Sequence, residues 1–119
     1  MALKTMIFHQ VGADITAKNT DGRTPLHYAA QEGCGVAALI NKGADVNERG
    51  NDGMTPLMVA TLKGQLEAAR TLVAACADVN AKKDNDVTAL MRAAFSKDEL
   101  ITEYMVEVTL LIIFVCVIQ

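Results

Sequence analysis

His27 and Cys34 are the residues of this chain whose types and spacing could form a nucleophile and its base. A cysteine reacts as its thiolate, and a neighbouring imidazole is a common means of removing the proton. Seven residues separate the two, so they could meet across the end of a helix. No third group is evident to orient the imidazole, and no pattern of oxyanion donors follows. We therefore expect that the protein is not an enzyme.

Metal and cofactor sites also lack a signature. The two histidines and three cysteines show no CxxC or HxxxH spacing, so we expect no metal site and no cofactor. An odd number of cysteines without a signal peptide fits free thiols in a reducing compartment. The expected location is the cytoplasm, with the nucleus as the alternative.

The charge pattern excludes nucleic acid as the expected partner. The net charge is -3, and lysines and arginines are scattered singly, so no basic stripe exists to neutralise phosphates. Aromatic residues make up only 4% of the chain and Trp is absent, which removes the platforms on which unpaired bases would stack.

The strongest pattern is an internal repeat. A line that begins Thr-Pro-Leu or Thr-Ala-Leu and continues into alanines occurs at residues 24–30, 55–60 and 88–94. A second marker, Gly or Cys followed by Ala-Asp, precedes each of these threonines by twelve residues, at 12–16, 43–47 and 76–80. A period near 33 with this first line is typical of helix-turn-helix units that stack into a solenoid.

Local chemistry predicts where the first helix of each unit begins and ends. Asp or Asn beside Gly makes a turn that tolerates positive φ, and the following Thr is a helix N-cap. Pro25 and Pro56 take the first helical position, where a missing N–H costs nothing. Gly33 and Gly64 are expected as left-handed caps. The predicted first helices span residues 25–32, 56–63 and 89–96.

The second helices differ in length. The middle unit has a helix at about 65–75, whereas the first unit lacks two residues and has a short helix within 34–42. Gly35 weakens the short helix by about 1 kcal/mol relative to Ala. Leu39 and Ile40 are expected to be its main core contacts. In the longer helix, the residues expected to face the core are Leu66, Ala69, Leu72 and Val73.

The recurring turn, threonine cap, small residues and Gly-Ala-Asp-Val-Asn resemble the ankyrin repeat over about residues 1–105. The resemblance implies an all-α, ankyrin-type helix-turn-helix solenoid of about three repeats with partial units at both ends. We expect an ankyrin repeat domain at 1–107 and an apolar tail at 108–119. The domain divides into a partial unit at 1–19 and units at about 20–50, 51–83 and 84–107.

Individual residues follow or depart from the ankyrin pattern. The resemblance implies a structural role for His27, bonding to the backbone between neighbouring units. Cys76, Asp86 and Lys97 stand where Gly is usual; for Cys76 and Lys97 a side chain at positive φ costs roughly 1 kcal/mol. Because residues 1–11 match only a second helix, we expect a fragment or a truncated product.

The same resemblance implies a protein-protein interaction module, with a protein partner of unknown identity held by hairpin tips and the concave face of the first helices. Met54, Leu62 and Phe95 would form an apolar anchor there or would simply pack on neighbouring units. The implied contact residues are Thr20, Asp21, Arg23, Gln31, Glu32, Asn51, Asp52, Met54, Leu62, Lys63, Asn85, Asp86, Val87, Phe95 and Ser96.

Asn47 and Asn80 each end a segment that reads L-x5-D-V-N. This is similar to the pattern that asparaginyl hydroxylases accept in ankyrin repeats, so both are candidates for hydroxylation. The alternative is that both asparagines only hold their loops by side-chain hydrogen bonds.

The tail after Glu107 matches no ankyrin unit. Eleven residues, 108–118, contain Thr109 as their only polar member. As a helix they would reach roughly 16 Å, about half of a bilayer's hydrocarbon thickness. The alternative function is therefore a membrane-associated protein tethered by residues 104–118. Other readings are a continuation of the last helix, which we favour as local structure, a segment covered by a missing partner, or non-native sequence. An exposed patch of this kind would promote self-association.

Overall fold

The computed structural model describes residues 15–96 and 98–118, with the side chains in these ranges other than those of Phe95, Ser96, Ile113 and residues 115–118. Over these residues the regular structure is six helices, apart from one antiparallel bridge between Lys82 and Thr88. The all-α prediction is confirmed. The helices are α2 (Pro25–Glu32), α3 (Val36–Asn41), α4 (Pro56–Leu62), α5 (Leu66–Ala74), α6 (Ala89–Ser96) and α7 (Glu99–Ile118).

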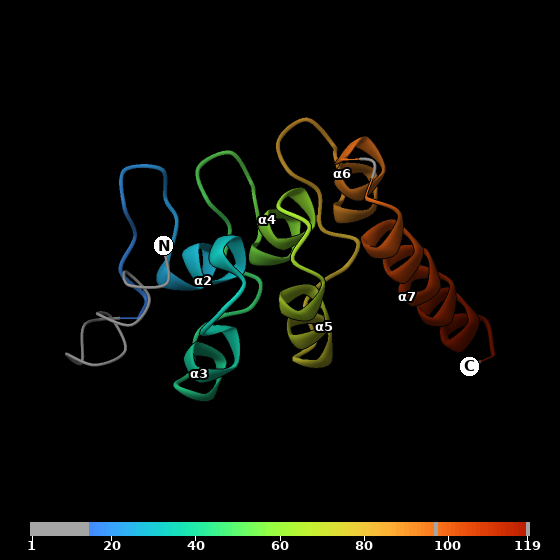
Figure 1. The fold of residues 1–119 in the computed structure, drawn as a ribbon, viewed down its shortest axis with the longest axis horizontal. Coiled ribbons are helices and arrows are strands. Elements are labelled where there is room, and N and C mark those ends of the chain that lie inside the picture. The colour runs from blue at the N-terminus through green and yellow to red at the C-terminus, as the bar shows by residue number, and fades with distance from the viewer. Residues whose placement is uncertain (1–14, 97, 119) are drawn as a thin grey trace.

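The helices form consecutive pairs along the longest axis of a molecule that measures 45 × 28 × 24 Å. The first helices α2, α4 and α6 lie in a row, α3 and α5 lie in a second row, and three loops project from one edge (Figure 1). α4 contacts both α2 and α6, α3 contacts α5, and α7 packs on α6. Each unit therefore packs on its neighbours in the chain, and the predicted helix-turn-helix solenoid is confirmed.

The first helices begin where the threonine caps predict. α2 and α6 have the predicted bounds, and α4 ends at Leu62, one residue before the predicted end. Thr55 has an extended backbone, and its Oγ1 accepts the N–H of Met58 at 3.3 Å. Gly33 (φ 79°) and Gly64 (φ 71°) adopt the predicted left-handed conformation after α2 and α4.

The middle unit is the most deeply buried because it has a neighbour on each side. Every residue from 54 to 61 is buried, and Leu57 is only 1% exposed. Burying one large apolar side chain of this kind contributes about 1.5–3 kcal/mol. In α5, Ala69 and Leu72 are fully buried as predicted, and Leu66 and Val73 are partly buried against the core.

The two missing residues shorten the second helix of the first unit. α3 spans only six residues and follows Gly35, whose φ is 79°. Leu39 is fully buried and Ile40 is partly buried against the core, as predicted. Val36 is also buried, at 4% exposure, and is a core contact that the sequence pattern did not predict.

Two non-glycine residues have positive φ at positions where glycine is usual. They are Cys76 (φ 69°), as predicted, and Asp86 (φ 64°). Lys97, predicted to share this conformation, and residues 1–14, predicted to hold a partial second helix, lie outside the described residues.

α7 is the second helix of the third unit, and it runs on because its sequence lacks the usual stop. α3 and α5 are followed by Gly43 (φ 97°) and Cys76 (φ 69°), whose left-handed backbones end the helical path. The equivalent position in the third unit is Thr109, whose Oγ1 donates to the carbonyl of Met105 inside the helix. The predicted continuation of the last helix is therefore confirmed.

The two halves of α7 have different surroundings. Ile101 and Met105 in the first half are fully buried. Leu110, Leu111 and Phe114 in the second half are 60%, 68% and 63% exposed. Figure 1 shows this half pointing away from the stack. Among the described residues, no helix has the length and apolar character needed to cross a membrane.

Candidate protein-binding surface

The edge of the stack from which the loops project consists of three hairpin loops, here called the tips: residues 19–23, 50–54 and 83–87. In each tip the first N–H donates to the carbonyl of the fifth residue, at 2.9–3.0 Å. Neighbouring tips are also joined. The N–H of Asn51 donates to the carbonyl of Asp21 at 2.8 Å, and the N–H of Asp84 donates to the carbonyl of Asp52 at 3.0 Å. The tips are therefore held in register with one another (Figure 1).

Close contact between tips explains the glycine in the first two turns. Gly22 (φ 74°) and Gly53 (φ 84°) are both buried. A Cβ atom on Gly22 would lie 2.8 Å from the backbone nitrogen of Asn51, and one on Gly53 would lie 2.9 Å from that of Asp84. Asp86, in the third turn, has an exposed side chain, because no further tip follows it within the described residues.

Side chains within the tips also fix the backbone. The Oδ1 of Asn19 accepts the N–H groups of Asp21 and Arg23 at 2.9 and 3.0 Å. The Oδ1 of Asp52 accepts the N–H of Met54 at 3.1 Å. Such bonds are typical of Asn and Asp in turns. They limit the conformations of the tips before any partner arrives.

His27 joins the first unit to the second. Its Nδ1 accepts the N–H of Thr24 at 3.1 Å, so the proton of the neutral ring lies on Nε2, which donates to the carbonyl of Met54 at 2.8 Å. Burial lowers the pKa of His27 below its usual 6.5, while the bond to Met54 acts in the opposite direction. The predicted structural role of His27 is confirmed.

The geometry around His27 gives no support to a catalytic pair with Cys34. Both ring nitrogens of His27 are engaged in hydrogen bonds, and the residue is 1% exposed, whereas Cys34 is exposed beyond the end of α2. Among the described residues, no three or more His, Cys, Asp or Glu side chains are grouped so that they could hold a metal ion.

The fifteen predicted contact residues differ in their exposure. Met54 is 1% exposed and lies in the core, so its prediction as a surface contact is wrong: the stacked third unit covers it. The side chains of Phe95 and Ser96 lie outside the described residues. Four residues are half-buried: Arg23, Gln31, Glu32 and Val87. Eight are exposed, and we call them the strip: Thr20, Asp21, Asn51, Asp52, Leu62, Lys63, Asn85 and Asp86.

The strip is acidic at the tips and changes character along the first helices. Asp21, Asp52 and Asp86 are exposed carboxylates in tips that precede the N-termini of α2, α4 and α6. A negative charge near a helix N-terminus is stabilised by the helix dipole. At the other end of α4, Leu62 is 39% exposed and Lys63 is exposed. The surface therefore offers a row of acceptors beside an apolar side chain and a cation.

The two asparagines predicted as hydroxylation candidates are both exposed. The Oδ1 of Asn47 accepts the N–H of Asp78 in the next unit at 2.7 Å, which confirms that this side chain holds a loop. The backbone N–H of Asn80 donates to Asp78 Oδ1 at 2.9 Å. Hydroxylation of either residue stays a prediction.

Some residues that shape this surface were missed by the sequence reasoning. Arg49 reaches across to the carbonyl of Lys82, and Lys18 forms an ion pair with Glu48 at 2.5 Å. Asn19 was seen only as a turn residue, although an Asn two residues before an Asp-Gly pair is a recognisable signal for its bonds. The bonds of Arg49 and Lys18 join distant segments and leave no local pattern.

Comparison with known families agrees with this geometry. The sequence profile of a family described as ankyrin repeats (3 copies) matches residues 2–83 and 52–112. The matched residues include the three tips and all six helices except the end of α7. No curated protein matches the chain at a significant level.

Proposed function

Because the chain belongs to the ankyrin repeat family, whose members are generally protein-interaction modules, we propose that it binds a protein partner along the strip and performs no catalysis. One observation carries this proposal. The tips are tied to one another by backbone bonds from Asn51 to Asp21 and from Asp84 to Asp52. A surface that is fixed before binding loses less conformational entropy when a partner docks.

The chemistry of the strip supports a partner of complementary character. The carboxylates of Asp21, Asp52 and Asp86 suit Lys, Arg or backbone N–H groups. Leu62, 39% exposed, would meet an apolar side chain beside them. Complementary charges of this kind contribute mainly to specificity and to the rate of association.

An intracellular location is part of the proposal. Cys34 and Cys76 are free and exposed, which suits a compartment that keeps thiols reduced. Localisation of the tagged full chain in cells by microscopy tests it, and secretion into an oxidising compartment would contradict it.

Two matched variants test the binding surface. Thr20→Arg/Asn85→Arg adds two cations at exposed tip positions, and Ala37→Arg/Ala74→Arg adds two at exposed positions of α3 and α5. We would purify proteins that bind the wild-type chain from cell extract and measure the affinity of each recovered partner for all three chains by calorimetry.

We expect the tip variant to lose at least tenfold in affinity, because the added side chains occupy the proposed contact surface, and the control variant to bind as wild type. A partner whose affinity falls only with the α3 and α5 changes would place the binding site on the second helices and refute the strip. Circular dichroism confirms that each variant keeps its helices.

A further inference from the structure

The outer side of α6 and α7, here called the end face, is equivalent to surfaces that the stack covers elsewhere. His27 in α2 and Met58 in α4 occupy equivalent positions and are 1% and 0% exposed. Met91, at the same position in α6, is 47% exposed. The difference follows from stacking, since a further unit covers the first two positions and none covers the third within the described residues.

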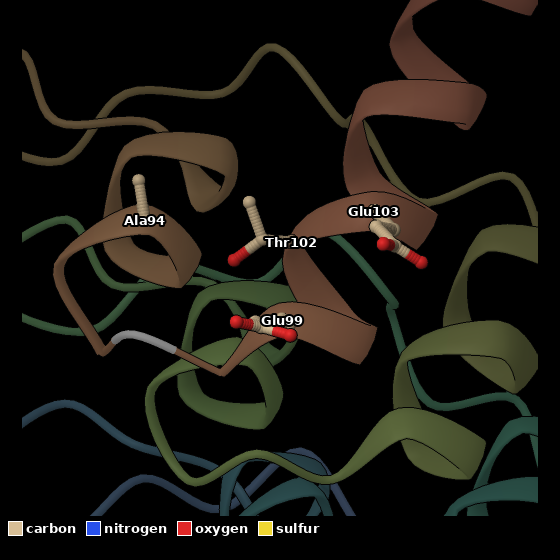
Figure 2. A pocket seen from close by; sticks show the side chains of 4 residues that line it. All are labelled: Ala94, Glu99, Thr102 and Glu103. Atoms are coloured by element: carbon tan, nitrogen blue, oxygen red, sulfur yellow. The ribbon is translucent and has the colours of Figure 1, made fainter.

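A groove of about 390 Å³ lies on the end face between α6 and α7. It is lined by Ala94 of α6 and by Glu99, Thr102 and Glu103 from the first two turns of α7 (Figure 2). In the middle unit the equivalent positions are Thr61, Leu66, Ala69 and Arg70.

Comparison of the two units shows that the end face differs in chemistry from an internal stacking surface. Thr61 and Ala69 are fully buried in the stack. Arg70 reaches the following unit, where its guanidinium lies 5.4 Å from the centre of the Tyr104 ring. In the third unit, Glu99 replaces the apolar Leu66 and Glu103 replaces the cationic Arg70. The end face is therefore matched to a cationic occupant, which a further unit like those of this chain would not supply.

The same side of α7 becomes apolar beyond the groove. Residues three or four apart lie on one side of a helix, so Glu99 and Glu103 are continued by Val106 and Leu110. Val106 is 40% exposed and Leu110 is 60% exposed. α7 contains three Glu and no Lys, Arg or His, so no cation of its own offsets these carboxylates.

We propose that the end face binds an amphipathic helix of a partner protein. That helix carries Lys or Arg residues opposite Glu99 and Glu103, and apolar residues opposite Val106 and Leu110. An amphipathic helix laid into a groove is a common mode of recognition. The proposal does not depend on the strip, because the end face lies on α6 and α7 and contains none of the strip residues.

The charge pattern disfavours a second copy of the chain as the occupant. Pairing two α7 helices in parallel would place the Glu99, Glu103 and Glu107 side chains of both copies near one another, which is destabilising. Pairing them antiparallel would leave the carboxylates of the groove without a cation. Self-association is therefore an outcome that the experiment must be able to detect.

The test uses two synthetic helical peptides of about 20 residues, roughly 30 Å long. One has two lysines four residues apart near one end of a face and leucines along the rest of it. The other has glutamates in place of the lysines. Fluorescence anisotropy with the full chain, at salt concentrations at which the Debye length is about 10 Å and then about 3 Å, measures both affinities.

We expect the basic peptide to bind at least tenfold more tightly than the acidic one at the lower salt, and the difference to shrink at the higher salt. Glu99→Gln/Glu103→Gln should weaken the basic peptide about three- to tenfold. Asp21→Asn/Asp84→Asn, which removes two carboxylates from the tips instead, should leave its binding unchanged. Circular dichroism checks that both variants keep their helices.

Three results would overturn the proposal. The first is equal binding of the two peptides, and the second is unchanged binding by the Glu99→Gln/Glu103→Gln variant. The third is dimerisation in sedimentation velocity that Leu110→Ser abolishes and that the basic peptide does not displace. Loss of peptide binding in the tip variant alone would place the peptide on the strip, and this outcome also contradicts an end-face site.

Discussion

Replacing His27 with methionine, the residue at the equivalent positions 58 and 91, tests how the first unit is held to the second. The change removes the bond from Nε2 to the carbonyl of Met54 and the acceptor for the N–H of Thr24. The Met54 carbonyl keeps a second donor, the N–H of Gly50 at 2.9 Å. Thr24 is only 4% exposed, so its N–H is left buried without this acceptor.

These losses set the expected magnitude. A hydrogen bond contributes about 0.5–1.5 kcal/mol net, and a buried donor left unpaired costs about 1–3 kcal/mol. Methionine restores apolar burial, so we expect the free energy of unfolding to fall by about 2 kcal/mol. For a domain of this size the melting temperature would fall by about 5–10 °C.

The pH dependence gives a second readout for the same variant. Burial lowers the pKa of His27 below 6.5, so the unfolded chain takes up this proton first as the pH falls. The stability that depends on the neutral ring is therefore complete above about pH 6.5 and is lost as the pH falls from there through the lowered pKa. The slope from one such group is at most about 1.4 kcal/mol per pH unit.

Urea unfolding followed by circular dichroism between pH 7.5 and 5 measures both effects. The comparison is made in a His9→Asn background, so that His27 is the only histidine that titrates. The reasoning is refuted if His27→Met is as stable as its parent at pH 7.5, or if the parent and the variant lose stability equally between pH 6.5 and 5.

The remaining predictions concern the stack and its tail. Leu72→Ala should cost about 2–5 kcal/mol in urea unfolding, because it empties a fully buried position of α5; an unchanged midpoint would contradict the core assignment. Cys76→Gly should raise the free energy of unfolding by roughly 0.5–1 kcal/mol, since it relieves a φ of 69° at an exposed site. Gly53→Ala should cost about 1–3 kcal/mol through the close approach of the next tip, with the loss seen in thermal melts. Deleting residues 108–119 should leave a cooperative melt, because Ile101 and Met105 stay in place, and should reduce association in sedimentation.

The sequence by itself determined the features that depend on neighbours along the chain. A threonine cap, a proline at the first helical position and a glycine after the last turn are local signals, and they placed α2 and α6 with their observed bounds. The missing Gly-Ala-Asp after Glu107 likewise favoured a continuous α7. The role of His27 came from the family resemblance, since nothing local shows that its partner is the carbonyl of residue 54.

The tertiary structure decided which side of each unit is covered. Met54 looked like a surface contact because it follows a turn, yet the stacked third unit buries it. Met91 has the same local setting as the buried Met58 and is 47% exposed, since burial is set by the presence of a following unit and not by the helix itself. The bonds between tips and the groove of the end face likewise join residues from different units or helices. Only stacking brings such residues together, so sequence determined the units of this protein, and packing between them determined its surfaces.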